Sequence, residues 1–132
     1  MLHQNIWQNA LQMVDNKFII LLTALILIDI ATGLLKSLVA SNTNSKTVSD
    51  KGLLGILKHC LVFIVVLVMY PIAETIGFQT YADWLLVYFI ITYAVSIMEN
   101  WGQAGLPLPS WVKDRLAKLQ DDYDHKGDDK NA

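Results

Sequence analysis

The residues of this sequence that could do chemistry are a few polar side chains set within long apolar stretches. Asp29, Thr32, Gly33 and Lys36 occur at i, i+3, i+4 and i+7, so a helix presents all four on one face. A carboxylate in the middle of a membrane helix costs about 2.5–3.5 kcal/mol to insert, so Asp29 is expected to face a partner helix or water. Small residues such as Gly33 allow helices to approach closely. Two interpretations stay open: a packing face with Asp29 paired to a lysine of a neighbouring helix, or a face that lines an aqueous opening between assembled helices.

A second polar group ends the third apolar stretch. Ser96, Glu99, Asn100 and Gln103 lie within one helical face. Polar residues and tryptophans such as Trp101 are typical of a helix end that enters the lipid headgroup zone. We favour that interpretation for Glu99 and Asn100, with a role in helix packing or in lining an opening as the alternative.

Motifs for catalysis or cofactor binding are not found. The sequence contains no Gly-rich phosphate loop, no nucleophile elbow and no H-E-x-x-H zinc motif. His59 and Tyr70 share a helical face, but no third ligand lies near them in sequence, so we interpret His59 as a packed or interfacial residue. The single Cys60 cannot form an internal disulfide. We expect no enzyme activity, cofactor or metal, and the formal net charge of -2 favours no nucleic-acid partner.

The elements that must position these residues are three continuous apolar stretches, in a chain that is 54% hydrophobic. They cover residues 18–39, 53–73 and 81–98. About twenty helical residues span the ~30 Å hydrocarbon core of a bilayer. Continuous rather than alternating apolar runs exclude a β-barrel. The sequence therefore predicts an all-α membrane protein with three transmembrane helices, in which Trp84, Tyr88 and Tyr93 are belt or packing aromatics.

Segments of mixed polarity flank these stretches. The N-terminal segment 1–17 is amphipathic and is either an interfacial helix or a frayed terminus, and Met13 offers an internal start. Residues Ala40–Asp50 are rich in Ser, Asn and Thr and are predicted to form a loop. A short helix is expected over Ser110–Leu119, followed by an acidic, polar tail. We thus divide the chain into 1–17, the membrane domain 18–98 and the C-terminal part 99–132.

The distribution of Lys and Arg predicts the orientation in the membrane. Basic residues border the first loop and follow the third helix: Lys36, Lys46, Lys51, Lys58, Lys113, Arg115 and Lys118. The second loop carries none, and cytoplasmic loops are the ones enriched in Lys and Arg. We expect a multi-pass protein of the bacterial cytoplasmic (inner) membrane with its N-terminus outside and its C-terminus in the cytoplasm.

Three ordered motifs resemble those of a known family. The segment 29–36 is similar to the D-x-x-T-G-x-x-K signature of phage holins, a family that includes clostridial toxin-secretion holins. Ser49, Gly52 and Lys58 resemble the family's S…G-L…K loop. Residues 96–100 and then Gly105 and Pro107 are similar to its S-I-x-E-N…G-x-P ending, so that the resemblance covers roughly 18–119. The sequence departs from the family at Tyr93, where relatives often carry an acid.

The resemblance implies a holin. Such a protein forms homo-oligomers in the host membrane and opens lesions that release an endolysin, or in some relatives a toxin, for host lysis. The released endolysin need not bind it directly, and an antiholin is a possible partner. Two other classes remain open: an antiholin or regulatory membrane subunit, and a small membrane enzyme or transporter subunit.

Overall fold

The computed structural model describes residues 1–39, 45–115 and 117–118, with the backbone alone for 45–51. Its elements are α1 (Leu2–Gln12), the 3-10 turn η1 (Met13–Asp15), α2 (Lys17–Val39), α3 (Ser45–Thr75) and α4 (Gln79–Gln103). A further short helix begins at Ser110. The described residues contain no strand, and three helices are long and apolar enough to cross a membrane. The predicted all-α fold with three transmembrane helices is confirmed.

Two helix boundaries differ from those predicted. The prediction of a loop over Ala40–Asp50 was wrong in part, because α3 already begins at Ser45. Residues 40–44 lie outside the described residues. Ser, Asn and Thr are weak helix formers, but without Pro or Gly they do not stop a helix. At its other end the third span extends beyond Met98, since α4 continues to Gln103. The polar residues that follow Met98 are therefore helical.

Glycines end both α3 and α4 in the same way. Gly77 (φ 85°) and Gly105 (φ 78°) take the left-handed conformation. The amide of Phe78 donates to the carbonyl of Ala73, and the amide of Leu106 donates to that of Trp101. These are the bonds of a Schellman motif, in which glycine is favoured because it has no Cβ. The turn after α3 and the end of α4 thus have a specific backbone cause.

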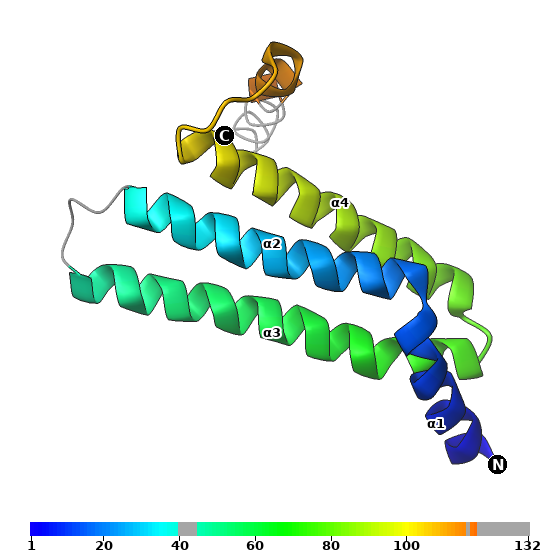
Figure 1. The fold of residues 1–132 in the computed structure, drawn as a ribbon. Helices are drawn as coiled ribbons and strands as arrows, with labels where there is room; N and C mark the ends of the chain where they lie inside the picture. The colour runs from blue at the N-terminus through cyan, green and yellow to red at the C-terminus, as the bar shows by residue number, and fades with distance from the viewer. Residues whose placement is uncertain (40–44, 116, 119–132) are drawn as a thin grey trace, which may run out of the picture.

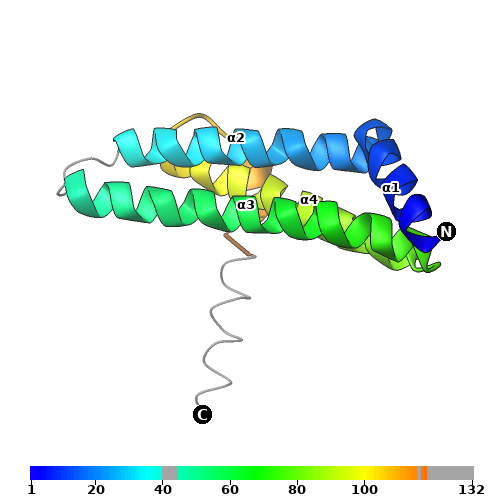
Figure 2. The same cartoon turned by 90° about the horizontal axis from the view of Figure 1, so that it is seen from below.

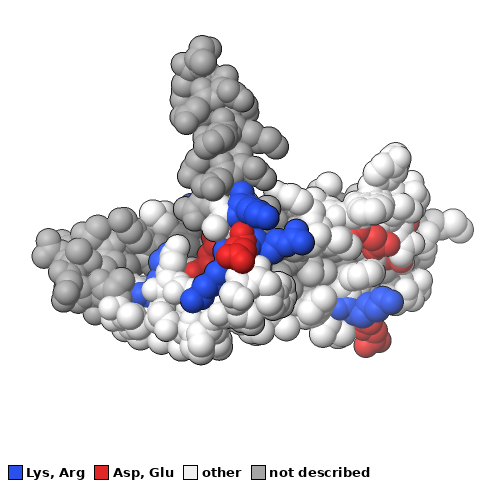
Figure 3. All heavy atoms as spheres, turned by 90° about the horizontal axis from the view of Figure 1, so that it is seen from above, with Lys and Arg blue, Asp and Glu red and all other residues white. Residues whose placement is uncertain are grey.

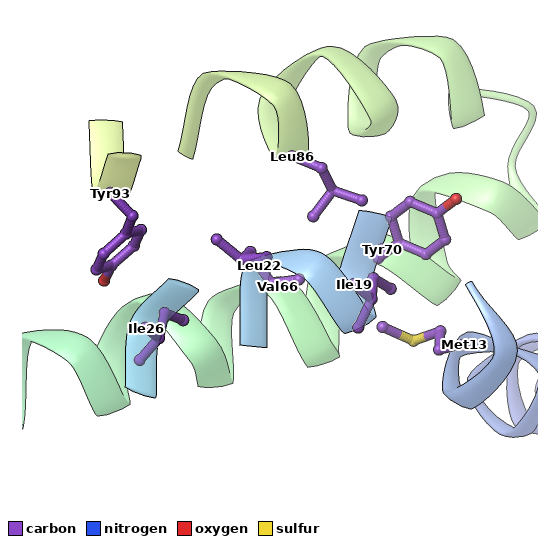
Figure 4. Packing of buried hydrophobic residues seen from close by; sticks show 8 residues of the cluster. All are labelled: Met13, Ile19, Leu22, Ile26, Val66, Tyr70, Leu86 and Tyr93. Atoms are coloured by element: carbon purple, nitrogen blue, oxygen red, sulfur yellow. The ribbon is translucent and has the colours of Figure 1, made fainter. Parts of the chain in front are cut away.

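The three long helices run side by side, with α2 and α4 parallel to each other and antiparallel to α3 (Figures 1 and 2). Met13 and seven residues from the long helices form the buried core: Ile19, Leu22, Ile26, Val66, Tyr70, Leu86 and Tyr93 (Figure 4). On α2, the core residues and Asp29 recur at helical spacing, so one face of α2 points inward. α1 crosses the end of the bundle at a steep angle to α2 (Figures 1 and 2).

The outer surface of the long helices is apolar. Large side chains such as Leu27, Leu61, Val68 and Ile91 are exposed along all three. Most of the surface in Figure 3 carries no charge, and basic side chains gather with a few acidic ones over the middle of that face. Contiguous apolar surface of this extent is unfavourable in water and fits lipid. The bundle has the surface of a membrane protein.

Candidate functional site

Asp29 lies at the centre of a polar cluster that joins all three long helices. Its side chain is only 4% exposed. Asn100 Nδ2 on α4 donates to Asp29 Oδ1 at 3.1 Å, and His59 Nε2 on α3 lies 3.5 Å from Asp29 Oδ2. The second distance exceeds the ~2.9 Å usual for such a hydrogen bond, so we describe it as an electrostatic contact. The buried carboxylate therefore has a partner on each of the other two helices.

Tyr93 extends the cluster on α4. Its hydroxyl lies 3.0 Å from His59 Nδ1. The donor of this hydrogen bond depends on the tautomer of the His59 ring, because Nδ1 either accepts from the hydroxyl or donates to it. The position at which resembling sequences often carry an acid thus faces His59, and here it supplies a hydroxyl.

The first predicted polar face contributes to the cluster unequally. Gly33 faces Asn100, since a Cβ on Gly33 would lie 3.6 Å from Asn100 Nδ2, an ordinary contact distance. The buried Thr32 donates its hydroxyl to the Asp29 carbonyl at 3.1 Å, within its own helix. Lys36 is half-buried and makes no ion pair with a described residue. Among the described residues Asp29 contacts His59 and Asn100 rather than the lysine of the packing interpretation, and Lys58 is exposed.

The second predicted polar face is divided in the structure. Asn100 points to α2, whereas Glu99 is exposed and Ser96 is half-buried. Successive residues of a helix point about 100° apart, so Glu99 and Asn100 cannot both face α2. Asn100 is a contact between spans rather than only a residue of a helix end.

The family-motif residues outside these faces do not join the cluster. Gly52 is half-buried in α3, and a Cβ there would meet nothing within 4 Å. Gly105 ends α4, and the Pro107 carbonyl accepts a 3.2 Å hydrogen bond from Trp101 Nε1. Gly105 and Pro107 therefore shape the exit of the chain from α4.

A second polar cluster, which the sequence did not suggest, lies at the opposite end of the bundle. Asn16 Nδ2 donates to the Tyr70 hydroxyl at 2.8 Å, and that hydroxyl donates to Asp83 Oδ1 at 2.9 Å. Asn16 Oδ1 also accepts from the amides of Phe18 and Ile19, which makes Asn16 the N-cap of α2. Each of the three spans is thus bound to the others at this end.

Apolar side chains separate the two clusters. Figure 4 shows Leu22, Val66 and Leu86 between Tyr70 and Tyr93. Leu22 and Leu86 are each only 1% exposed. In the described residues, buried apolar side chains from all three spans therefore lie between the two clusters.

The sequence held a signal that could have predicted the contact between Asp29 and His59. His59 and Asp29 lie at similar distances along the chain from the predicted loop, on its two sides. In an antiparallel hairpin of two spans, such residues lie at the same depth in the membrane. No comparable sequence signal pairs Asn16 with Tyr70, because the bend between α1 and α2 decides where Asn16 lies.

The fold and the cluster define a multi-pass membrane protein whose spans meet through buried polar side chains. A sequence model of the bacteriophage holin family matches residues 7–121. The chain therefore belongs to the bacteriophage holin family, which points to a non-enzymatic membrane protein.

One of the relatives that match the chain has a name that agrees with that family. The chain is 32% identical over 114 residues to a probable holin of Bacillus phage phi105, covering 83% of this chain and 79% of the relative. It is 35% identical over 108 residues to an uncharacterised protein of Halalkalibacterium halodurans, covering 77% of each. An uncharacterised protein of Clostridium perfringens is 27% identical over 103 residues, or 76% of this chain and 73% of the relative. No solved structure matches the chain.

Proposed function

We propose that this chain assembles with copies of itself in the bacterial cytoplasmic membrane and opens lesions that release an endolysin. One observation carries the proposal: Asp29, within a membrane-spanning helix and 4% exposed, is held by Asn100 and His59 from the two other spans. A carboxylate in a span is costly, and such residues mark aqueous or ion pathways. Membership in the holin family supports a role for that pathway in forming lesions.

The closed bundle and an open lesion need different surfaces. The bundle presents apolar side chains such as Leu61 and Ile91 to lipid and keeps Asp29 and Asn100 inside. The wall of a lesion must present one polar face to water. Separating α2 from α4 frees these polar groups to line that face. The packing and lining interpretations then describe the same residues before and after assembly.

The proposal includes partners and an orientation. Self-association builds the lesion in the lipid bilayer, and the endolysin passes through without a required contact. A toxin is the alternative cargo, and an antiholin is a possible regulator. The Lys and Arg residues around the first loop and after α4 favour a cytoplasmic C-terminus and an external N-terminus.

Induced expression beside an endolysin that lacks a secretion signal tests the proposal. We expect growth to stop abruptly at a set time and the culture to lyse. A matched culture with an inactive endolysin should stop growing without lysing, which separates membrane damage from wall hydrolysis. Sustained growth with the protein verified in the membrane would reject the lytic role and favour an antiholin.

A further inference from the structure

The orientation of α1 differs from that of every span. Both ribbon views show α1 across the end of the bundle (Figures 1 and 2). α2 begins at Lys17, only a short turn after α1 ends at Gln12. When the spans stand upright in a bilayer, α1 therefore lies along the membrane surface, at the level where α2 enters the lipid.

One side of α1 is fixed to the bundle. Ile6, Asn9, Ala10 and Met13 are its less exposed residues, and they recur at i, i+3, i+4 and i+7. Asn9 Nδ2 donates to Thr75 Oγ1 at 3.0 Å, and Met13 belongs to the buried core. These contacts make α1 an ordered part of the fold and exclude the frayed terminus.

A second side of α1 is polar and uncharged. It carries the exposed Gln4, Asn5, Gln8 and Gln12, which follow one another around the helix. Gln12 also lines a cavity of about 180 Å³ with residues that include Asp15 and Glu74. Carboxylates that line an open cavity at the end of the spans mark the side that faces water.

The third side of α1 is apolar, and the described residues leave it uncovered. Trp7, Leu11 and Val14 follow at i, i+4 and i+7 and are 66%, 56% and 73% exposed. This side is continuous with the apolar surface of the spans, which lipid covers. Tryptophan is enriched at the membrane–water interface. α1 itself contains no Asp, Glu, Lys or Arg, and His3 is its one titratable side chain, so charge gives it little means of recognising a protein partner.

We propose that α1 is an interfacial helix that binds the bilayer surface through Trp7 and Leu11, with Val14 of η1 beside them, and turns Asn5 and Gln12 to water. Its binding rests on apolar contact, because it carries no Asp, Glu, Lys or Arg and His3 is its one titratable side chain. Lipid charge should therefore have little effect on its binding. The inference needs only a membrane-embedded bundle and is independent of the lytic role.

Site-directed labelling of the full chain in liposomes tests this inference. Cys60 is replaced by Ala, and single cysteines at positions 5, 7, 11 and 12 receive an environment-sensitive fluorophore. In neutral phosphatidylcholine vesicles we expect blue-shifted emission at 7 and 11, quenched by lipids with a nitroxide at the headgroup. Aqueous iodide should quench 7 and 11 several-fold less than 5 and 12, which lie on the polar side of the helix. The same pattern is expected after addition of anionic phosphatidylglycerol.

Each other outcome contradicts the proposal in a recognisable way. Equal iodide quenching at all four positions would mean that α1 does not bind the bilayer. Protection of 7 and 11 without nitroxide quenching, together with self-quenching between labels, would assign that side to a second copy of the chain. Protection that appears only with anionic lipid would show that charge, not the apolar side, drives binding. If cells still lyse normally, any of these results would contradict the proposed role of α1 but not the proposed lytic function.

Discussion

Asn100 on α4 hydrogen-bonds to Asp29 on α2 at 3.1 Å, across 71 positions of the sequence. Two motifs at opposite ends of the membrane domain thus meet in one contact inside the bundle. The contact gives the buried carboxylate an N–H donor, which lipid cannot supply. An assembly that separates α2 from α4 must replace that donor by water or by a group from another copy.

Replacing Asp29 by Leu should separate insertion from lesion formation. Asp29→Leu removes an insertion cost of about 2.5–3.5 kcal/mol, so the variant should enter the membrane at least as well. Lysis should be delayed or lost, because the inner face of α2 no longer favours water. Membrane fractionation and lysis timing are measured together. Thr23→Val is the matched control, since the Thr23 hydroxyl only bonds the Ile19 carbonyl of the same helix. Normal timing with Leu at position 29 would contradict a lining role.

The Asp29–Asn100 contact should show energetic coupling. Asn100→Ala is expected to destabilise the folded bundle by about 0.6 kcal/mol and by at most ~1.7 kcal/mol, the mean and the maximum found for hydrogen bonds between membrane helices. The same change in an Asp29→Leu background should cost markedly less, because the acceptor is already absent. Unfolding of the purified protein in mixed detergent micelles gives the four free energies of this cycle. Equal costs in both backgrounds would show that the two side chains act independently.

The sequence was sufficient to predict the three spans but predicted the polar cluster around Asp29 only in part. Continuous apolar stretches predict spans because the bilayer selects for length and hydrophobicity. The spacing of Asp29, Thr32 and Gly33 predicted an inward face of α2, and all three lie at or beside the cluster. A lysine partner for Asp29 belonged to one of the two interpretations that the sequence left open. His59 and Asn100 take that place through helix pairing, which local spacing does not encode.

The second polar cluster shows a different limit of the sequence. Asn16 caps α2 and also reaches Tyr70, whose hydroxyl donates to Asp83. Each of these residues stands near an end of a predicted element, where polar residues are expected for many reasons. The bend between α1 and α2 places Asn16 beside Tyr70, and the turn between α3 and α4 places Asp83 there. Tertiary arrangement, rather than residue type, creates this cluster.

The proposed orientation can be tested by cysteine labelling in intact cells. In a Cys60→Ala background, single cysteines are placed at Ser45, Gln79 and Asn131, with a fourth at Gln4. The Lys and Arg asymmetry predicts that only positions 4 and 79 react with an impermeant thiol reagent before lysis. Permeabilised cells provide the control, since all four positions should then react. Labelling at position 45 in intact cells would reverse the proposed topology.

Two glycines should respond oppositely to alanine. Gly105→Ala forces a Cβ into the left-handed conformation (φ 78°) and should destabilise the end of α4 by about 1 kcal/mol. Gly52→Ala lies within α3, where a Cβ meets nothing within 4 Å, and should stabilise the helix by about 1 kcal/mol. Thermal unfolding in detergent followed by circular dichroism compares the two. Destabilisation by Gly52→Ala would reveal a contact at that position beyond the single chain.

The charges after α4 predict separate roles for the C-terminal helix and the tail. Lys113 and Arg115 are exposed, and Lys118 follows them. Anionic lipids should attract each basic residue near the surface by about 1 kcal/mol. The last twelve residues carry the acidic side chains Asp121, Asp122, Asp124, Asp128 and Asp129. The basic group is thus placed to hold the helix at the membrane while the acidic tail is repelled from it.

Deleting residues 121–132 should advance lysis at equal protein level. Repulsion between acidic tails is screened beyond ~8 Å at physiological salt, so it acts only when subunits nearly touch. It should therefore oppose the last step of assembly and leave insertion, topology and lethality unchanged. Replacing the five Asp residues by Asn at full length is the matched control for chain length and should advance lysis to the same extent. Lysis curves at matched expression provide the measurement. Unchanged or later lysis would count against repulsion, whereas an effect of the deletion without an effect of the Asn variant would assign it to tail length.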